Sequence, residues 1–160
     1  FVAQIGIVDL IERFEVMAEL EGMAGRLAER RSSLEDIQAL ESAMAGCGKA
    51  AAADDADAYY YQNEQFHQII YRASQNRFLE LEACRLHARL KPYRRMQLRM
   101  RDRMANSQEE HGQIVEAIRS GNAQAAESYL VEHVVVQGER CDDFVATINT
   151  AHHVRSSGIG

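Results

Sequence analysis

One proline, Pro92, stands in a chain of 160 residues, and this scarcity constrains the fold more than any other feature. Proline is the residue least compatible with a helix interior, so a chain almost free of it can form long helices. No stretch alternates apolar and polar residues for long, which is the pattern of a half-buried strand. Alanine, glutamate, arginine, leucine and methionine, which favour helices, are abundant. The sequence therefore predicts an all-α fold.

The spacing of apolar residues, together with turn signals, predicts where the helices lie. The predicted helices cover about 7–30, 33–45, 58–73, 77–104, 107–119 and 123–148. Pro92 falls inside the fourth of them, where it should kink or break the helix because it removes one backbone hydrogen bond.

Capping residues predict the ends of these helices. Ser32 and Glu35 match a capping box before the second helix, and Gly46 and Gly48 should close that helix. One of three aspartates should cap the third helix, Asn106 or Ser107 the fifth, and Asn122 the last; the aspartates are Asp54, Asp55 and Asp57.

Charge and cysteine content limit the class of protein. The chain has 18 basic and 24 acidic residues and a net charge of −6, which disfavours a nucleic-acid binder that uses its whole surface. It has neither an apolar run long enough to cross a membrane nor a signal peptide. Three widely spaced cysteines, Cys47, Cys84 and Cys141, make a poor disulfide framework. These features predict a cytoplasmic protein.

Three of the six histidines stand at helical positions that border apolar faces. They are His67, His111 and His133. Asn63 precedes His67 by four residues, so both side chains can reach one point. Neutral imidazoles suit zinc and several other transition metals. A histidine beside an apolar face is, however, more often a hydrogen-bonded core residue. Spacing alone therefore leaves a metal site and a packed core both open.

The other histidines carry less information. His87 lies among arginines and should face solvent, while His152 and His153 lie near the end of the chain and should be uninvolved. The HExxH motif of zinc proteases is absent. The one Glu-x-x-His pair, Glu64 with His67, has no second copy, as a carboxylate-bridged di-iron bundle would require.

Residues 85–103 carry eight basic side chains and one acidic side chain, Asp102. Most of the basic side chains should form a solvated helix face. Arg89 and Arg94 stand at helical steps from Leu86 and Leu90, so one or both can point inward. A buried guanidinium needs an anionic partner, and a ligand carboxylate bound in fork geometry would serve.

Several segments, taken in order, resemble one protein family. They are residues 63–67 (NEQFH), 74–79 (SQNRFL) and 110–122 (EHGQIVEAIRSGN), then Ala125, Ala126 and His133, with residues 14–30 at the start. Over about 7–145 the chain is similar to the effector-binding C-terminal domain, or FCD domain, of the FadR subfamily of GntR-type transcription regulators.

The resemblance implies an antiparallel bundle of six to seven helices with a central cavity for a metal ion and a ligand. It places the metal ligands at Asn63, His67, His111 and His133. Zinc is the first expectation, with nickel, cobalt, manganese or iron as alternatives. The implied effectors are small carboxylates or sugar acids. We expect Arg89, Arg94 and Tyr60 to orient the carboxylate.

The resemblance also implies a domain organisation. Residues 1–6 would be a linker remnant, 7–148 the sensor domain and 149–160 a flexible tail. DNA would be read by a separate N-terminal winged-helix domain that this chain lacks. Family members are usually homodimers, and the domain is not an enzyme.

Two positions depart from the family pattern. Asn63 stands where Asp is common, so the ligand set is neutral and should hold a metal less tightly and depend more on an anionic effector. Met17 stands where many members have an arginine, so the polar contacts to the effector should differ from those of relatives.

Two other functions are alternatives. A metal-dependent hydrolase or isomerase could use three histidines to activate water, and it would need Glu64 or Glu110 as a base, although both are expected to be exposed. A helical dimerisation module without metal would simply pack the histidines in its core.

Overall fold

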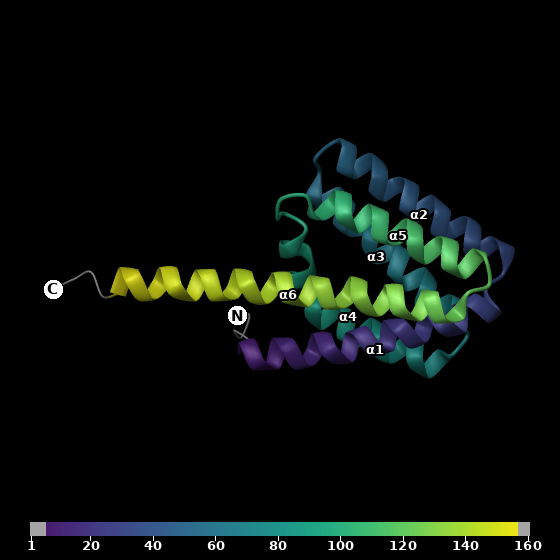
Figure 1. Cartoon of the computed structure of the whole chain (residues 1–160), viewed down its shortest axis with the longest axis horizontal. Coiled ribbons are helices and arrows are strands. Elements are labelled where there is room, and N and C mark those ends of the chain that lie inside the picture. The colour runs from purple at the N-terminus through teal and green to yellow at the C-terminus, as the bar shows by residue number, and fades with distance from the viewer. Residues whose placement is uncertain (1–5, 157–160) are drawn as a thin grey trace.

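The computed structural model describes residues 6–156, and these form six helices and no strand (Figure 1). The helices are α1 (Ile7–Arg31), α2 (Leu34–Ala52), α3 (Ala56–Ala73), α4 (Arg77–Gln97), α5 (Arg103–Arg119) and α6 (Ala123–Ser156). The predicted all-α class is confirmed. Residues 1–5 and 157–160, which include most of the predicted linker remnant and the end of the predicted tail, lie outside the described residues.

Two helix pairs form the frame of the bundle. Helix α1 packs along α6, helix α2 packs against α3, and α5 contacts both α2 and α6. Two glycines allow the close approach of α1 to α6, because a Cβ atom at Gly22 or Gly25 would collide with Val131 or Leu130. Helix α4 contacts α1, α3 and α6 on another side.

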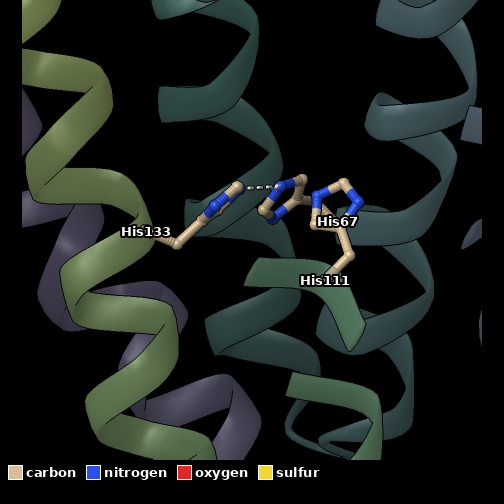
Figure 2. Close-up of side chains that lie close together, drawn as sticks. All are labelled: His67, His111 and His133. Carbon is tan, nitrogen blue, oxygen red and sulfur yellow. Dashed lines mark hydrogen bonds between the residues drawn. The ribbon is translucent and has the colours of Figure 1, made fainter. Parts of the chain in front are cut away.

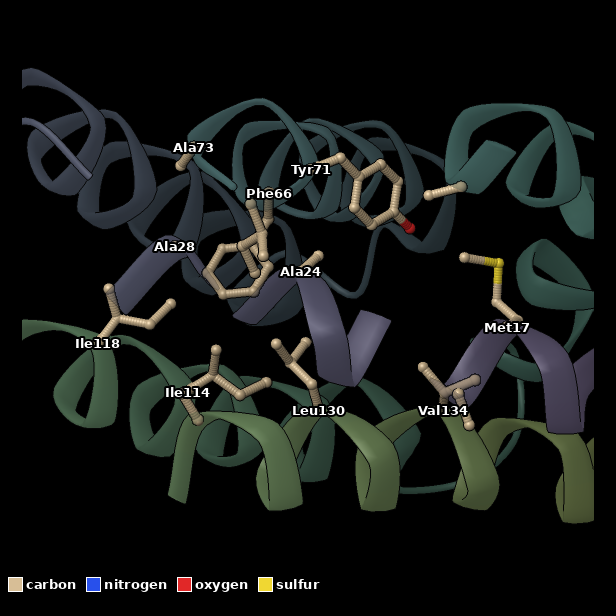
Figure 3. Packing of buried hydrophobic residues seen from close by; sticks show 14 of the residues in the cluster. Met17, Ala24, Ala28, Phe66, Tyr71, Ala73, Ile114, Ile118, Leu130 and Val134 are labelled. Atoms are coloured by element: carbon tan, nitrogen blue, oxygen red, sulfur yellow. The ribbon is translucent and has the colours of Figure 1, made fainter. Parts of the chain in front are cut away.

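A continuous apolar core joins all six helices, and Figure 3 shows part of it. Among its buried members are Met17, Ala24 and Ala28 of α1, Phe66 and Tyr71 of α3, Ile114 and Ile118 of α5, and Leu130 and Val134 of α6. Burial of such side chains is the main source of stability in a bundle of this kind. The core also fixes the faces of α3, α5 and α6 that carry the three histidines.

The predicted capping box before α2 exists one residue later than expected. The hydroxyl of Ser33, not of Ser32, accepts a hydrogen bond from the Asp36 N–H at 3.1 Å, and the Asp36 carboxylate accepts one from the Ser33 N–H at 3.0 Å. Ser32 instead ends α1, where its hydroxyl donates to the carbonyl of Ala28. Both residues can cap a helix, so the sequence alone did not decide between them.

Helix α2 continues to Ala52 instead of closing near Ala45. Gly46 and Gly48 lie inside it, where Cβ atoms would press against the side chains of Gln62 and Gln108. These glycines permit close packing and do not cap the helix, so that prediction was wrong. Asp55, one of the three predicted caps of α3, accepts a hydrogen bond from the Ala58 N–H at 2.9 Å.

The boundary between α4 and α5 also differs from the prediction. Helix α4 passes through Pro92 without a break and ends at Gln97, and α5 begins at Arg103 rather than after Asn106 or Ser107. The turn between them contains Asp102 in a left-handed conformation with φ of 59°. Asp102 directly precedes α5, and its left-handed conformation separates α5 from the turn without any glycine or proline.

Helix α6 begins after Asn122 as predicted, and the Asn122 side chain accepts a hydrogen bond from the Ala125 N–H at 3.0 Å. It runs on to Ser156, so the end predicted at Ile148 was wrong and the predicted tail is helical that far. The far part of α6 extends beyond the other five helices (Figure 1). Within residues 6–156, no helix combines the length and apolar character needed to span a membrane.

Candidate metal centre

Three histidines from three helices converge in the interior (Figure 2). His67 lies on α3, His111 on α5 and His133 on α6, and all three are at most 1% exposed. One ring nitrogen from each lies within 4.8 Å of the others, and Nε2 of His67 is 3.2 Å from Nε2 of His133. The side chains that the sequence singled out are therefore brought together by the fold, although 66 residues separate His67 from His133.

Asn63 lies one turn before His67 on the same face of α3 and is 1% exposed. Its carbonyl oxygen Oδ1 accepts no hydrogen bond from the described residues. Leaving a buried polar atom unsatisfied costs about 1–3 kcal/mol, so native proteins rarely tolerate it without a ligand or a function. The Asn63 oxygen is thus a donor atom that lacks a protein partner.

Both ring nitrogens of His111 also lack hydrogen-bond partners in the part of the chain that the structure describes. Its Nδ1 and Nε2 atoms make no hydrogen bond with the described residues, and the ring stacks on Phe66 with 4.1 Å between centroids. Phe66 holds the ring in place but offers no hydrogen-bonding group. A buried imidazole with two unpartnered nitrogens is suited to receive a metal ion through one of them.

His67 and Glu21 form the inner part of a buried polar group that we call the interior triad, Arg94–Glu21–His67. Nδ1 of His67 lies 2.6 Å from Oε2 of Glu21. The other carboxylate oxygen, Oε1, accepts hydrogen bonds of 2.7 Å from Arg94 and from the hydroxyl of Tyr71. All four side chains are 0% exposed.

His133 belongs to a second group, the rim triad, Arg103–Glu110–His133. Nδ1 of His133 is in close contact with Oε2 of Glu110, and Arg103 donates to both carboxylate oxygens at 2.8 and 2.6 Å. The side chain of Glu110 is 24% exposed, so this triad reaches the edge of the bundle. On its other side, the Gln137 amide donates to Nε2 of His133 at 2.8 Å.

Burial controls the charge of the histidines. Loss of hydration lowers the pKa of His67, lowers that of His111 well below its ordinary value, and lowers that of His133 to about 4. All three histidines are therefore neutral at pH 7, which is the form that binds a metal.

The two carboxylates are ionised. Burial raises the pKa of Glu21, but the charge of Arg94 and the contact with His67 outweigh that effect and hold the pKa well below its ordinary value. Burial opposes ionisation of Glu110 as well, yet its contacts with Arg103 and His133 bring its pKa to about 2. The two carboxylate charges are balanced by the two arginine charges, so the site has no net charge of its own.

Glu21 was not identified as a site residue from the sequence. The signal was available, because Glu21 follows Met17 by four residues and Ala18 by three and so lies on the apolar face of α1. An acidic residue within an apolar stripe is buried and needs a partner. Arg103 was counted only as part of the basic stretch, yet it is 1% exposed.

His87 does not face solvent, and that prediction was wrong. It is 2% exposed, and its Nδ1 lies 3.0 Å from the hydroxyl of Tyr71. The inward face of α4 is formed by Ala83, His87, Leu90 and Arg94, which follow each other at steps of three or four residues. The arginines around His87 in the sequence occupy other faces of the same helix.

Of the residues expected to contact an effector, two are buried and one is exposed. Arg94 is 0% exposed, and its Nε and one of its terminal nitrogens, NH2, have no hydrogen-bond partner among the described residues. Tyr60 is also buried, and its hydroxyl donates to Glu64 at 3.4 Å. Arg89 is exposed, because it precedes Leu90 and therefore points about 100° away from the buried face.

Three further expectations concern the surroundings of the site. Glu64 and Glu110 are partly buried rather than exposed, with side-chain exposures of 21% and 24%. The side chains of His152 and His153 lie outside the described residues.

Surface hollows of about 510, 420, 650 and 550 Å³ are lined by other parts of the chain and not by the three histidines, so the central ligand cavity stays a prediction.

Comparisons with known proteins agree with this architecture. The structure of a GntR protein from Streptococcus agalactiae is similar, with a TM-score of 0.70 and 21% sequence identity over 81% of this chain. The match spans 58% of that longer protein. No curated protein gives a significant match. The model of the FCD domain family matches residues 12–135, and the chain therefore belongs to the FCD domain family.

Proposed function

We propose that this chain is the ligand-sensing domain of a GntR-type transcription regulator that binds a divalent metal ion and a small carboxylate effector. Membership of the FCD family supports the regulatory role. The observation that carries the metal site is the convergence of three buried, neutral histidines within 4.8 Å. The unpartnered Oδ1 of Asn63 and the unpartnered nitrogens of His111 add to this support.

The donor set fits a transition metal. Three imidazole nitrogens and one amide oxygen suit zinc foremost, and also nickel, cobalt, manganese or iron. Asn63, His67, His111 and His133 would hold the ion. When bound, it would act as a Lewis acid that attracts an anionic group to its open positions.

The effector would be a small carboxylate or sugar acid. Because the charges of the two triads cancel, the +2 charge of a bound ion would be left for the effector to neutralise. Arg94 offers unpartnered guanidinium nitrogens in the same interior, and these suit a carboxylate. Tyr60 is the second effector contact in this proposal. Arg89 is exposed, so we assign it no direct contact.

Control of DNA would depend on a second domain. The Streptococcus agalactiae GntR is longer than this chain, which covers 58% of it. We propose that an N-terminal winged-helix domain reads the DNA, that the protein acts as a cytoplasmic homodimer, and that effector binding shifts the populations of two arrangements of the paired domains.

The two alternative functions receive less support. A hydrolase would need a free carboxylate base beside the metal, but Glu110 is paired with Arg103 and His133 and has a pKa of about 2, which makes it a weak base. A module with merely packed histidines would be expected to satisfy their nitrogens, and both nitrogens of His111 lack partners among the described residues.

Metal analysis of the purified protein tests the metal site. We expect about one zinc ion per chain after addition of zinc, together with a rise in the melting temperature. Replacement of His133 by Ala should lower zinc affinity at least about 100-fold, because one of three imidazole ligands is lost. The matched control, His152→Ala, should bind zinc as the original chain does. Equal losses in both variants, or no zinc effect on the original chain, would contradict the proposal.

A thermal-shift screen tests the effector class. Small carboxylates and sugar acids should raise the melting temperature of the zinc-loaded protein, and an Arg94→Lys variant should respond less because Lys lacks the planar fork. If neutral sugars stabilise the protein as well as the acids do, the carboxylate proposal is wrong.

A further inference from the structure

His67 and His133 are held in the same way, although they lie on different helices. Each ring directs its Nδ1 atom toward a glutamate, Glu21 or Glu110. Each glutamate is also held by an arginine that is at most 1% exposed. The Nε2 atoms of the two rings then face each other at 3.2 Å.

These contacts determine which ring nitrogen carries the proton. An ionised carboxylate can only accept hydrogen bonds, so Nδ1 of His133 donates to Glu110. Nδ1 of His67 lies 2.6 Å from Oε2 of Glu21 without hydrogen-bond alignment, and at this distance a proton on Nδ1 avoids the repulsion of two facing lone pairs. A neutral imidazole has one ring proton, and Nε2 must therefore present a lone pair. The Gln137 amide, which donates to Nε2 of His133 at 2.8 Å, supports the same tautomer from the opposite side of the ring.

This arrangement has an electrostatic consequence. With both protons on Nδ1, two nitrogen atoms that carry lone pairs lie 3.2 Å apart in a buried site, and the lone pair of His133 also accepts the hydrogen bond from Gln137, which a bound cation would replace. Two lone pairs at this distance repel, and a cation that both can bind removes the repulsion. The histidines are thus organised for a shared cation before any cation arrives.

We propose that Glu21 and Glu110 are positioning residues that fix His67 and His133 in the Nδ1–H tautomer, with Nε2 turned toward the common centre. This inference rests on the metal site proposed above. Partners of this kind typically contribute a factor of about 10–100 to metal affinity. They orient the ligands without neutralising the ion, because Arg94 and Arg103 cancel their charges.

The Glu110→Gln variant provides a sharp test, since Glu110 lies at the edge of the bundle and a glutamine has nearly the same shape. Arg103 donates to both oxygens of Glu110, and Oε2 also contacts Nδ1 of His133, so an amide in this place turns its NH₂ group toward an Arg103 donor in either orientation. The variant therefore replaces the charged acceptor of the His133 proton with a neutral amide that cannot satisfy Arg103 and His133 as the carboxylate does. We expect His133 to change to the Nε2–H tautomer while His67 stays as it is.

The readout is ¹⁵N NMR of the histidine rings in the metal-free protein at pH 7, with zinc affinity measured separately by competition with a chelator. In the original chain, both His67 and His133 should be Nδ1–H tautomers. Glu110→Gln should weaken zinc binding about 10–100-fold. The control Glu109→Gln removes an equal charge from the exposed neighbouring residue and should change neither tautomer nor affinity.

Two results would overturn the inference: an Nε2–H tautomer of either ring in the original chain, or a Glu110→Gln variant that keeps the His133 tautomer and binds zinc as tightly as Glu109→Gln. The original spectrum decides the first point without any substitution. It also needs no metal. A chain that binds no zinc would therefore refute the metal-site proposal, while the tautomers would still decide the role of the two glutamates.

Discussion

The interior triad and the rim triad use the same three side-chain types in different surroundings. Arg94, Glu21 and His67 are all 0% exposed, whereas Glu110 of the rim triad is 24% exposed. A fully buried ion pair loses the hydration of both partners, and this loss offsets most of the attraction between them. We therefore expect the interior triad to tolerate substitution less well than the rim triad.

The triads also differ in how they are assembled. Arg103 and Glu110 are seven residues apart, two turns along α5, so their pairing requires only one helix. Glu21 and Arg94 are 73 residues apart on α1 and α4. The interior triad therefore forms only when α1, α3 and α4 pack together, and it reports on their tertiary packing.

The largest expected difference between the triads is in stability. Glu21→Gln leaves Arg94 buried with no counter-charge and should lower the free energy of unfolding by about 3–5 kcal/mol. Glu110→Gln also leaves the buried Arg103 without its counter-charge, but it should cost less, about 1–3 kcal/mol, because water reaches the side chain at position 110. Urea unfolding followed by circular dichroism measures both, with Glu19→Gln, an exposed position on the same helix, as the control.

A double variant sharpens this comparison. Replacing Glu21 and Arg94 together by Met should recover much of the stability that Glu21→Gln loses, since no unpaired charge remains. If Glu110→Gln destabilises the protein as much as Glu21→Gln does, the distinction between the two triads fails.

The rim triad should also give a measurable pH dependence. Burial lowers the pKa of His133 from 6.5 to about 4, so the unfolded chain takes up that proton first as the pH falls. Stability should decrease between pH 6.5 and 4, by about 2–3 kcal/mol from this residue. Glu110, whose pKa falls from 4.5 to about 2, extends the loss of stability below pH 4.5.

The experiment is urea unfolding of the metal-free protein across this pH range. A His133→Gln variant should show a shallower decline between pH 6.5 and 4 than the original chain. Parallel curves for the two proteins would mean that His133 does not titrate as its burial requires.

The smallest expected effect is that of a carboxylate placed among the proposed metal ligands, whereas Glu21 and Glu110 contact the histidine ligands from outside. Asn63→Asp adds a negative charge to a ligand set that is otherwise neutral, and should tighten zinc binding about tenfold at pH 7. Chelator competition measures this change, and Gln65→Glu, at an exposed position two residues away, is the control. Weaker zinc binding by Asn63→Asp would show that Asn63 is not a ligand.

The features predicted best from the sequence depend on local periodicity. Helical spacing identified all six helices and placed His67, His111 and His133 on inward faces. Errors occurred where tertiary packing overrides local signals. Gly46 and Gly48 lie inside α2 because neighbouring side chains pack closely there.

The polar interior was harder to predict than the helices. Glu21, His87 and Arg103 are buried because partners on other helices, or two turns away, compensate them. A linear sequence does not reveal which distant side chains meet. It does reveal a charged residue in an apolar stripe, and this rule would have identified Glu21.

The length of α6 has a mechanical consequence. His133 lies in the part of this 34-residue helix that packs in the bundle, and the helix continues to Ser156 beyond the other helices (Figure 1). At about 1.5 Å per residue, the distance from His133 to the end of the helix is about 35 Å. A tilt of about 5° pivoting at His133 would displace that end by about 3 Å. A small tilt of α6 at the metal centre would therefore be amplified along the part of the helix that extends beyond the bundle (Figure 1).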